Sequence, residues 1–213
     1  MPDEPTPDAH RRAAARLRAL ADRLAAHELS APEVLRVDEA LAGLVAELDD
    51  PPETTRYARL MGAALAAGLD AERSRDVQNG HPLAEGSSGI YPVVHMELDL
   101  PRLVAEVDFS PAFEGPPGLV HGGFLAAGFD MAMSALALQV LDHSVTRHLR
   151  LRYLAPTFLG GAVRFELEAA EVTGRTVDIA GRLVDATGRT TMRGSGQFAS
   201  MGLDRFVDRP RPT

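Results

Sequence analysis

The residues with the clearest potential for chemistry lie in a glycine-rich turn and in the apolar segment that follows it. The run Gly115-Pro-Pro-Gly-Leu-Val-His-Gly-Gly123 leads directly into a helical pattern, and Asp130 follows Gly122 by eight residues. Glycines at the start of a helix free the backbone where unpaired N–H groups and the helix dipole favour a developing negative charge. Such a turn can act as an oxyanion hole in acyl transfer.

Asp130 lies near the middle of the apolar segment, between Phe129 and Met131. A carboxylate in these surroundings is partly buried, which suits a general base working near neutral pH. Each feature also has a purely structural interpretation. Paired glycines can serve a tight turn, a buried aspartate can satisfy a local hydrogen bond, and His121 can cap or pack against the helix. The conjunction of these features favours a functional site over the separate structural interpretations.

The spacing of Gly122 and Asp130 bears on how such a site is assembled. Eight residues correspond to about 12 Å along a helix axis. An oxyanion donor and a base must each lie about 3 Å from the same reacting centre. A single helix cannot bring the two together. If both act, we expect a homodimer with the site shared between subunits, and a tetramer built as a dimer of dimers stays open.

The elements that hold these residues are indicated by the periodicity of the chain. Helices are predicted in the first third, over 9–27, from the Ser30-Ala-Pro-Glu33 capping box toward Leu48, and over 55–69. From about Ile90 the period changes to two. The pattern predicts two strands before the apolar segment and four after it, near 91–98, 102–109, 146–154, 163–170, 177–183 and a last one ending at about Ser200. Short turns between strands favour antiparallel neighbours.

The apolar segment from Gly122 to Leu141 is predicted to be a buried central helix. It is apolar on nearly all sides, which suits a helix wrapped by other elements. Its length would just span a bilayer, but Asp130 at its centre disfavours insertion. We therefore predict an α+β fold in which an antiparallel sheet curls around this helix. The expected organisation is an N-terminal helical extension over 1–78, the sheet domain over 79–203 and a disordered tail over 204–213.

Composition excludes several classes of function. The 213 residues carry 22 basic side chains, all of them arginine, against 30 acidic ones, for a net charge of −8. This balance argues against nucleic-acid and membrane partners. The chain has no cysteine, which removes disulfides, thiolate nucleophiles and cysteine-based metal sites, and we expect no metal centre. The first 30 residues contain no apolar signal-peptide region, so we expect a cytoplasmic protein.

The motifs around the glycine-rich turn resemble a known family. The segment from Phe113 to Gly123, with Asp130 after it, resembles the PaaI-like branch of hotdog-fold acyl-CoA thioesterases, and most closely the subgroup of mammalian thioesterase superfamily members four and five. The resemblance covers about residues 79–200 and includes the Tyr-x-x-Pro ending of the strand that begins at Thr146. It departs from some members at Gly115, where those members carry an asparagine that helps to hold substrate or water.

The resemblance implies a hotdog fold and the hydrolysis of an acyl-CoA thioester to a free acid and CoA, a reaction of lipid metabolism. In that subgroup an aspartate on the central helix is the nucleophile or general base, and a threonine sixteen residues later helps to position water. Asp130 and Thr146 stand at that separation. The Gly122 N–H would then bind the thioester carbonyl. Asp130 of the other subunit would activate water or attack the carbonyl carbon directly.

The same resemblance implies a substrate-binding set. His121 and Gly123 would shape the carbonyl site, and Arg150 and Arg152 are candidate contacts for the CoA phosphates. CoA is part of the substrate, so no separate cofactor is implied. Two alternatives stay open: a hotdog dehydratase or hydratase acting on acyl thioesters, and a non-catalytic acyl-CoA-binding sensor that uses the N-terminal helices as an interaction module.

Overall fold

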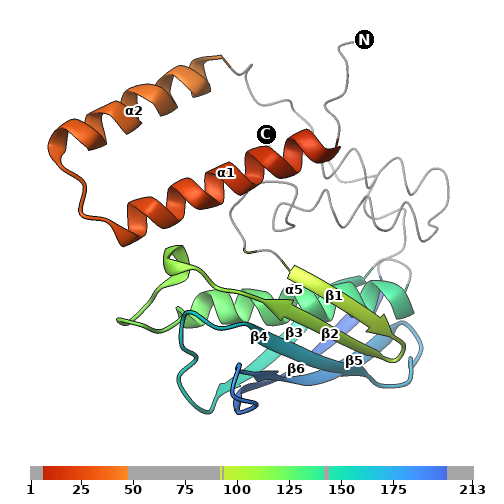
Figure 1. Ribbon diagram of the computed structural model, residues 1–213. Helices are drawn as coiled ribbons and strands as arrows, with labels where there is room; N and C mark the ends of the chain where they lie inside the picture. Colours follow the sequence, from red (N-terminus) through yellow and green to blue (C-terminus); the bar gives the residue numbers. More distant parts are fainter. Residues whose placement is uncertain (1–6, 48–91, 93, 142–143, 201–213) are drawn as a thin grey trace, which may run out of the picture.

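The structure is a computed structural model that describes residues 7–47, 92, 94–141 and 144–200. Among these residues two helices come first, followed by a sheet that is interrupted in sequence by one long helix (Figure 1). In chain order the elements are α1 (Pro7–Ala26), α2 (Ala31–Ala46), β1 (Val94–Asp99), β2 (Arg102–Val107), the short 3-10 helix η1 (Pro111–Phe113), α5 (Gly122–Val140), β3 (Ser144–Tyr153), β4 (Val163–Ala169), β5 (Thr176–Val184) and β6 (Thr190–Ser200).

The six strands form one sheet in the order β1-β2-β4-β5-β6-β3, and every neighbouring pair is antiparallel. The predicted α+β fold with two strands before the central helix and four after it is confirmed. The expectation that all consecutive strands after the helix are neighbours is wrong for β3 and β4. The nine residues between Tyr153 and Val163 are too many for a tight hairpin, and they let β3 pair with β6 at the edge of the sheet.

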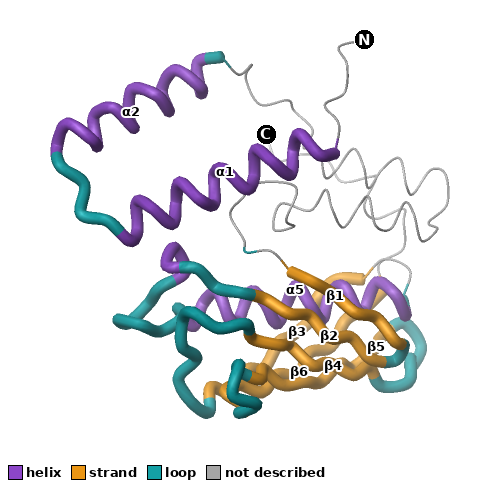
Figure 2. Tube along the Cα trace, in the orientation of Figure 1, coloured by secondary structure: helices purple, strands orange, loops and turns teal. Residues whose placement is uncertain are grey.

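Helix α5 lies along one face of the sheet and supplies the centre of the core (Figure 2). Phe129, Met133 and Leu136 are completely buried, and the ring of Phe129 meets that of Phe165 edge-on at 5.1 Å between centroids. Gly194 on β6 allows this packing, because a Cβ there would lie 2.7 Å from the Phe129 ring. By length and composition α5 is able to cross a membrane, but its packing against five strands identifies it as the predicted core helix.

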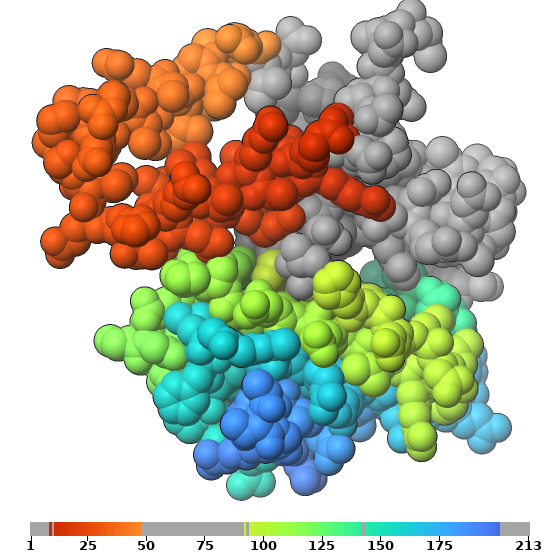
Figure 3. All heavy atoms as spheres, viewed as in Figure 1, coloured from red at the N-terminus to blue at the C-terminus, as the bar shows by residue number. Residues whose placement is uncertain are grey.

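The two described N-terminal helices differ in how they relate to the sheet domain. Helix α1 packs on η1, and Asp22 anchors it: Oδ1 of Asp22 accepts hydrogen bonds from the Ser110 hydroxyl at 2.5 Å and from the Ala112 N–H at 3.4 Å. Helix α2 has no buried residue. Figure 3 shows α1 between α2 and the sheet domain. The extension therefore touches the domain next to the glycine-rich turn.

The predicted start of α2 is confirmed. The Ser30 N–H donates to the Glu33 carboxylate at 2.8 Å, as in a capping box, and the Ser30 hydroxyl donates to the same carboxylate at 2.6 Å. These hydrogen bonds, that of the hydroxyl first, lower the pKa of Glu33 below its ordinary value of 4.5. The helix predicted over 55–69, the predicted domain boundary at residues 78 and 79 and the predicted tail over 204–213 lie outside the described residues.

Candidate active site

Asp130 and Thr146 meet where the middle of α5 passes the beginning of β3. The Thr146 hydroxyl donates a hydrogen bond to Oδ1 of Asp130 at 2.9 Å. Asp130 is half-buried, as predicted, and Thr146 is exposed at the edge of the sheet. Thr146 engages only Oδ1 of the carboxylate. The other oxygen, Oδ2, has no partner among the described residues, so it is free to accept a proton from water or to attack an electrophile.

A β-bulge turns Thr146 toward the helix. Thr146 pairs with Phe198 and His148 pairs with Gln197, so Arg147 is the extra residue of β3. In a regular strand, residues three apart such as Thr146 and Leu149 face opposite sides. The bulge places both on the helix side, while the Arg147 guanidinium donates to Gln197 Oε1 at 3.1 Å. The bulge was not predicted from the strand pattern, although the two consecutive polar residues Arg147 and His148 break the alternation and mark its position.

His121 caps the N-terminus of α5. Its Nδ1 accepts the Gly123 N–H at 3.0 Å, and its carbonyl accepts the N–H groups of Phe124 and Leu125 at 3.0 and 3.3 Å. In the neutral ring the proton therefore lies on Nε2. The capping interpretation of His121 is correct, and it occupies the Gly123 N–H. The Gly122 N–H, in contrast, has no acceptor within the described part of the chain and is available to a ligand.

Tyr153 is a site residue that the sequence analysis noted only as part of a family motif. Its hydroxyl donates to the Gly122 carbonyl at 2.8 Å. Its ring lies so close that a Cβ on Gly122 would be 3.3 Å from ring atom Cε1. The last residue of β3 therefore holds the first residue of α5.

The glycine-rich turn is held by hydrogen bonds that its backbone N–H groups donate. The His121 N–H donates to the Phe113 carbonyl at 2.9 Å, and Gly118, with φ of +77°, donates its N–H to the Glu114 carboxylate at 2.6 Å. At Gly115, where some relatives carry asparagine, a Cβ would lie 2.9 Å from the His121 Cα. In this chain the backbone at residue 115 packs closely against His121, and glycine supplies no side chain there to hold substrate or water.

The single chain forms two separate groups of site residues. Asp130 lies with Thr146, and Gly122 lies with His121 and Tyr153. Because α5 is one continuous helix, Gly122 and Asp130 are about 12 Å apart along its axis. The structure of one chain therefore leaves the oxyanion donor and the carboxylate apart, as their spacing predicted.

Arg150 and Arg152 are not brought to either group. They alternate with Leu149 and Leu151, which pack against the core, so both arginines point from the outer face of the sheet. Arg152 lies opposite Arg193 of β6. Strand alternation places them on the other side of the sheet from Asp130, and their predicted contact with CoA phosphates stays a prediction.

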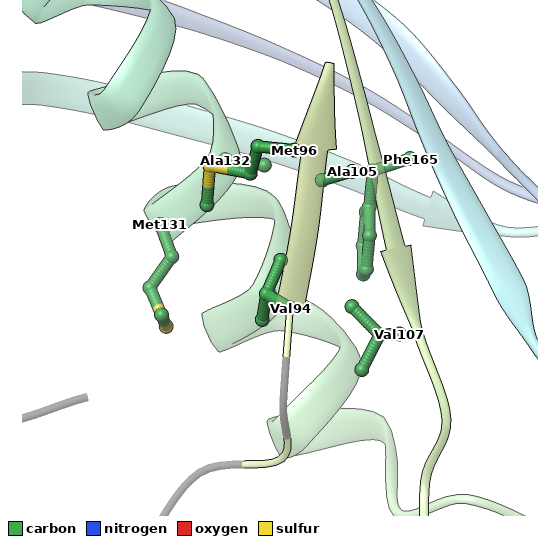
Figure 4. Close-up of a pocket in the computed structure, with 8 residues that line it drawn as sticks. Val94, Met96, Ala105, Val107, Met131, Ala132 and Phe165 are labelled. Carbon is green, nitrogen blue, oxygen red and sulfur yellow. The ribbon is translucent and has the colours of Figure 1, made fainter. Parts of the chain in front are cut away.

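An apolar pocket lies between α5 and the first two strands (Figure 4). Its volume is about 10 Å³, which is no more than one water molecule needs. Met131 lines it from the helix and Met96 from β1, whereas Met133 is fully buried in the core. The remaining lining residues are Val94, Ala105, Val107, Gly128, Ala132 and Phe165. This pocket is too small to hold an acyl chain in the described conformation.

Comparisons with known proteins bear on this domain. The family model of the thioesterase superfamily matches residues 117–192, a range that contains the turn from residue 117 onward, Asp130 and Thr146. The acyl-coenzyme A thioesterase THEM4 of Xenopus laevis is 33% identical over 76 residues, which are 36% of this chain and 34% of that protein. The chain thus matches about a third of the length of this relative.

Two solved structures are similar in fold. A thioesterase superfamily protein of known crystal structure aligns with a TM-score of 0.71 at 22% identity, covering 90% of each chain, so the likeness extends beyond the sheet domain. A Streptococcus mutans UA159 protein bound to acetyl CoA aligns with a TM-score of 0.50 at 12% identity, covering 53% of this chain and 92% of that one. The match over residues 117–192 and the THEM4 relative support the resemblance to PaaI-like thioesterases that was drawn from the sequence, and the solved structures show the same hotdog fold.

Proposed function

We propose that this chain is an acyl-CoA thioesterase whose active site is completed in a homodimer. The observation that carries the proposal is the hydrogen bond from Thr146 to Asp130, which orients a half-buried carboxylate at the open edge of the sheet. The family match and the THEM4 relative support a thioester as the substrate. The Streptococcus mutans structure with acetyl CoA supports CoA as the carrier of the acyl group.

The proposed reaction uses Asp130 as the base. Oδ2 of Asp130 takes a proton from a water molecule held by Thr146, and the water oxygen attacks the thioester carbonyl carbon. The carbonyl oxygen becomes negatively charged and accepts the Gly122 N–H of the other subunit. Breaking the carbon–sulfur bond then releases the acid and CoA thiolate, which receives the proton from Asp130. Direct attack by Asp130 would instead give an anhydride, which water hydrolyses to the same products.

The open edge of β3 supports the proposed dimer. One side of β3 pairs with β6, and the other side has no partner strand among the described residues. Exposed edge strands offer unpaired N–H and C=O groups to another chain. A second copy at this edge would lie next to Asp130 and Thr146, where the missing oxyanion donor has to come from. Contacts of Arg150 and Arg152 with CoA phosphates stay part of the proposal and would be made from the outer face.

The proposed function is tested by measuring the release of CoA thiol from short-chain, long-chain and aromatic acyl-CoAs. The chain has no cysteine, so it contributes no thiol background. We expect Asp130→Asn to lower kcat by about 10²–10⁴-fold, as loss of a general base does. Asp185→Asn is the matched control, because this carboxylate accepts a hydrogen bond from the Thr187 hydroxyl at 2.6 Å in the turn between β5 and β6, outside both groups of site residues.

Three results would contradict the proposal. Binding of acyl-CoA without thiol release across the panel would favour the sensor. Conversion of an enoyl or hydroxyacyl thioester with the carbon–sulfur bond intact would favour the dehydratase or hydratase. Full activity of the Asp130→Asn variant would remove Asp130 from the mechanism.

A further inference from the structure

Tyr153 has a specific relation to the candidate oxyanion donor. Its hydroxyl donates to the Gly122 carbonyl at 2.8 Å, and its ring covers the Gly122 Cα, where a Cβ would be 3.3–3.4 Å from ring atoms Cε1 and Cζ and from the hydroxyl oxygen. This contact joins residues 31 positions apart in the chain. It fixes the carbonyl group of the residue whose N–H would bind the substrate.

The first turn of α5 needs such a restraint. Gly122 and Gly123 are adjacent, and glycine has the greatest backbone freedom of any residue. The His121 cap holds the Gly123 N–H, and the His121 carbonyl is held by Phe124 and Leu125. Tyr153 adds a hydrogen bond on the Gly122 carbonyl. Together these contacts leave the Gly122 N–H as the unoccupied donor of the turn and fix its direction.

We propose that Tyr153 is a positioning residue that orients the Gly122 N–H as the oxyanion donor. An oxyanion hole is effective because its donors are fixed before the reaction, within about 2.7–3.1 Å of the developing charge. The inference rests on the proposed function, since it needs the thioester carbonyl of a substrate to be bound at the Gly122 N–H. The same strand carries Thr146 at its other end, so β3 sets the direction of both the donor and the base.

The test compares Tyr153→Phe with the unaltered protein. Phenylalanine keeps the ring against Gly122 and removes only the hydroxyl. We expect kcat for acyl-CoA hydrolysis to fall about tenfold with KM within twofold, because a misaligned donor loses part of the 10²–10³-fold effect of an oxyanion-hole hydrogen bond. Thr176→Val is the matched control, because the Thr176 hydroxyl donates to a backbone carbonyl, that of Thr173, at 3.1 Å, outside both groups of site residues.

A spectroscopic readout separates positioning from general stability. An acyl-CoA labelled with 13C at the thioester carbonyl is bound to Asp130→Asn, and its carbonyl stretching frequency is recorded. We expect the added Tyr153→Phe change to move this frequency toward its value in water, and the added Thr176→Val change to leave it where it was. An active enzyme in which Tyr153→Phe alters neither kcat nor this frequency would overturn the proposal.

Amide hydrogen exchange tests the same role without substrate. We expect the Gly123 amide to exchange at least about threefold faster in Tyr153→Phe, because loss of a hydrogen bond worth roughly 1 kcal/mol loosens the first turn. If the unaltered protein releases no CoA, the proposed function fails, and the exchange rate still decides whether Tyr153 fixes the turn. Unchanged exchange at Gly123 would then show that it does not.

Discussion

Replacing Thr146 by valine removes one hydroxyl and keeps the branched side chain that suits a strand. The hydroxyl donates to Asp130 Oδ1 at 2.9 Å, and it is the hydrogen bond that orients the carboxylate. Hydrogen bonds to charged groups contribute about 1.5–3 kcal/mol. Thr146 is exposed in the single chain, so the lower end of this range applies. Since about 1.4 kcal/mol corresponds to a factor of ten, we expect kcat to fall about tenfold in Thr146→Val.

The assay is CoA thiol release at saturating acyl-CoA, with KM measured in parallel. We expect KM to change by less than about twofold, because Thr146 acts on the carboxylate and water rather than on the bound acyl group. Thr146→Ser keeps a hydroxyl at the same position and should retain most of the activity. The reasoning is refuted if Thr146→Val has the kcat of the unaltered enzyme, or if Thr146→Ser is as slow as Thr146→Val.

Three further predictions concern the fold and its N-terminal helices. Gly194→Ala places a Cβ 2.7 Å from the Phe129 ring, and we expect a loss of about 1–3 kcal/mol in urea unfolding; an unchanged midpoint would contradict the packing. The hydrogen bonds from Ser30 depress the pKa of Glu33, so they stabilise α2 above pH 4.5 and this stabilisation is lost as the pH falls through the lowered value. The protection factors of the amides over residues 31–46, which are corrected for the intrinsic pH dependence of exchange, should therefore fall in acid; Ser30→Ala removes the hydroxyl bond and keeps the N–H bond, so it should weaken that dependence, and an unchanged dependence would contradict the role of the hydroxyl. Asp22→Ala removes the acceptor that anchors α1 to η1, and exchange over residues 7–26 should rise while the sheet stays protected; equal protection in both proteins would show that Asp22 is not the anchor.

Local patterns were sufficient to predict the elements of the sheet domain. Strict alternation over 163–169 and the all-round apolar pattern of α5 each specify one conformation and one buried face. The capping box at Ser30 is likewise a local signal, and the structure contains it. The family resemblance singled out Asp130 and Thr146, and the structure brings them together in one hydrogen bond, while their catalytic roles stay a prediction.

The features that were not predicted depend on contacts between distant residues. The position of β3 at the sheet edge follows from pairing with β6, about 50 residues later in the chain, as the Arg147–Gln197 hydrogen bond illustrates. The bulge at Arg147 reverses the side of the sheet on which Thr146 lies, and alternation counted along the chain alone misses it. The contact of Tyr153 with Gly122 joins the end of a strand to the start of a helix, which no local pattern indicates.

The central claim is that Gly122 of one subunit and Asp130 of the other form one active site, and subunit mixing tests it most directly. Gly122→Pro removes the N–H that would bind the oxyanion, and Gly122→Ala, which keeps the N–H and adds the same Cβ at 3.3 Å from the Tyr153 ring, controls for that contact. Proline is well suited to the first position of a helix, and His121, with φ of −62° and ψ of 129°, already has the conformation preferred before proline. Asp130→Asn removes the base. Gly122→Pro and Asp130→Asn are each expected to be inactive alone.

When the two variants are co-expressed or refolded together, half of the dimers contain one subunit of each kind. In those dimers one site combines the intact Gly122 with the intact Asp130, and the other site carries both changes. We predict recovery of about a quarter of the activity of the unaltered enzyme, because half of the dimers are mixed and each mixed dimer has one intact site out of two. Mixed dimers with no activity above either variant alone would contradict a site shared between subunits.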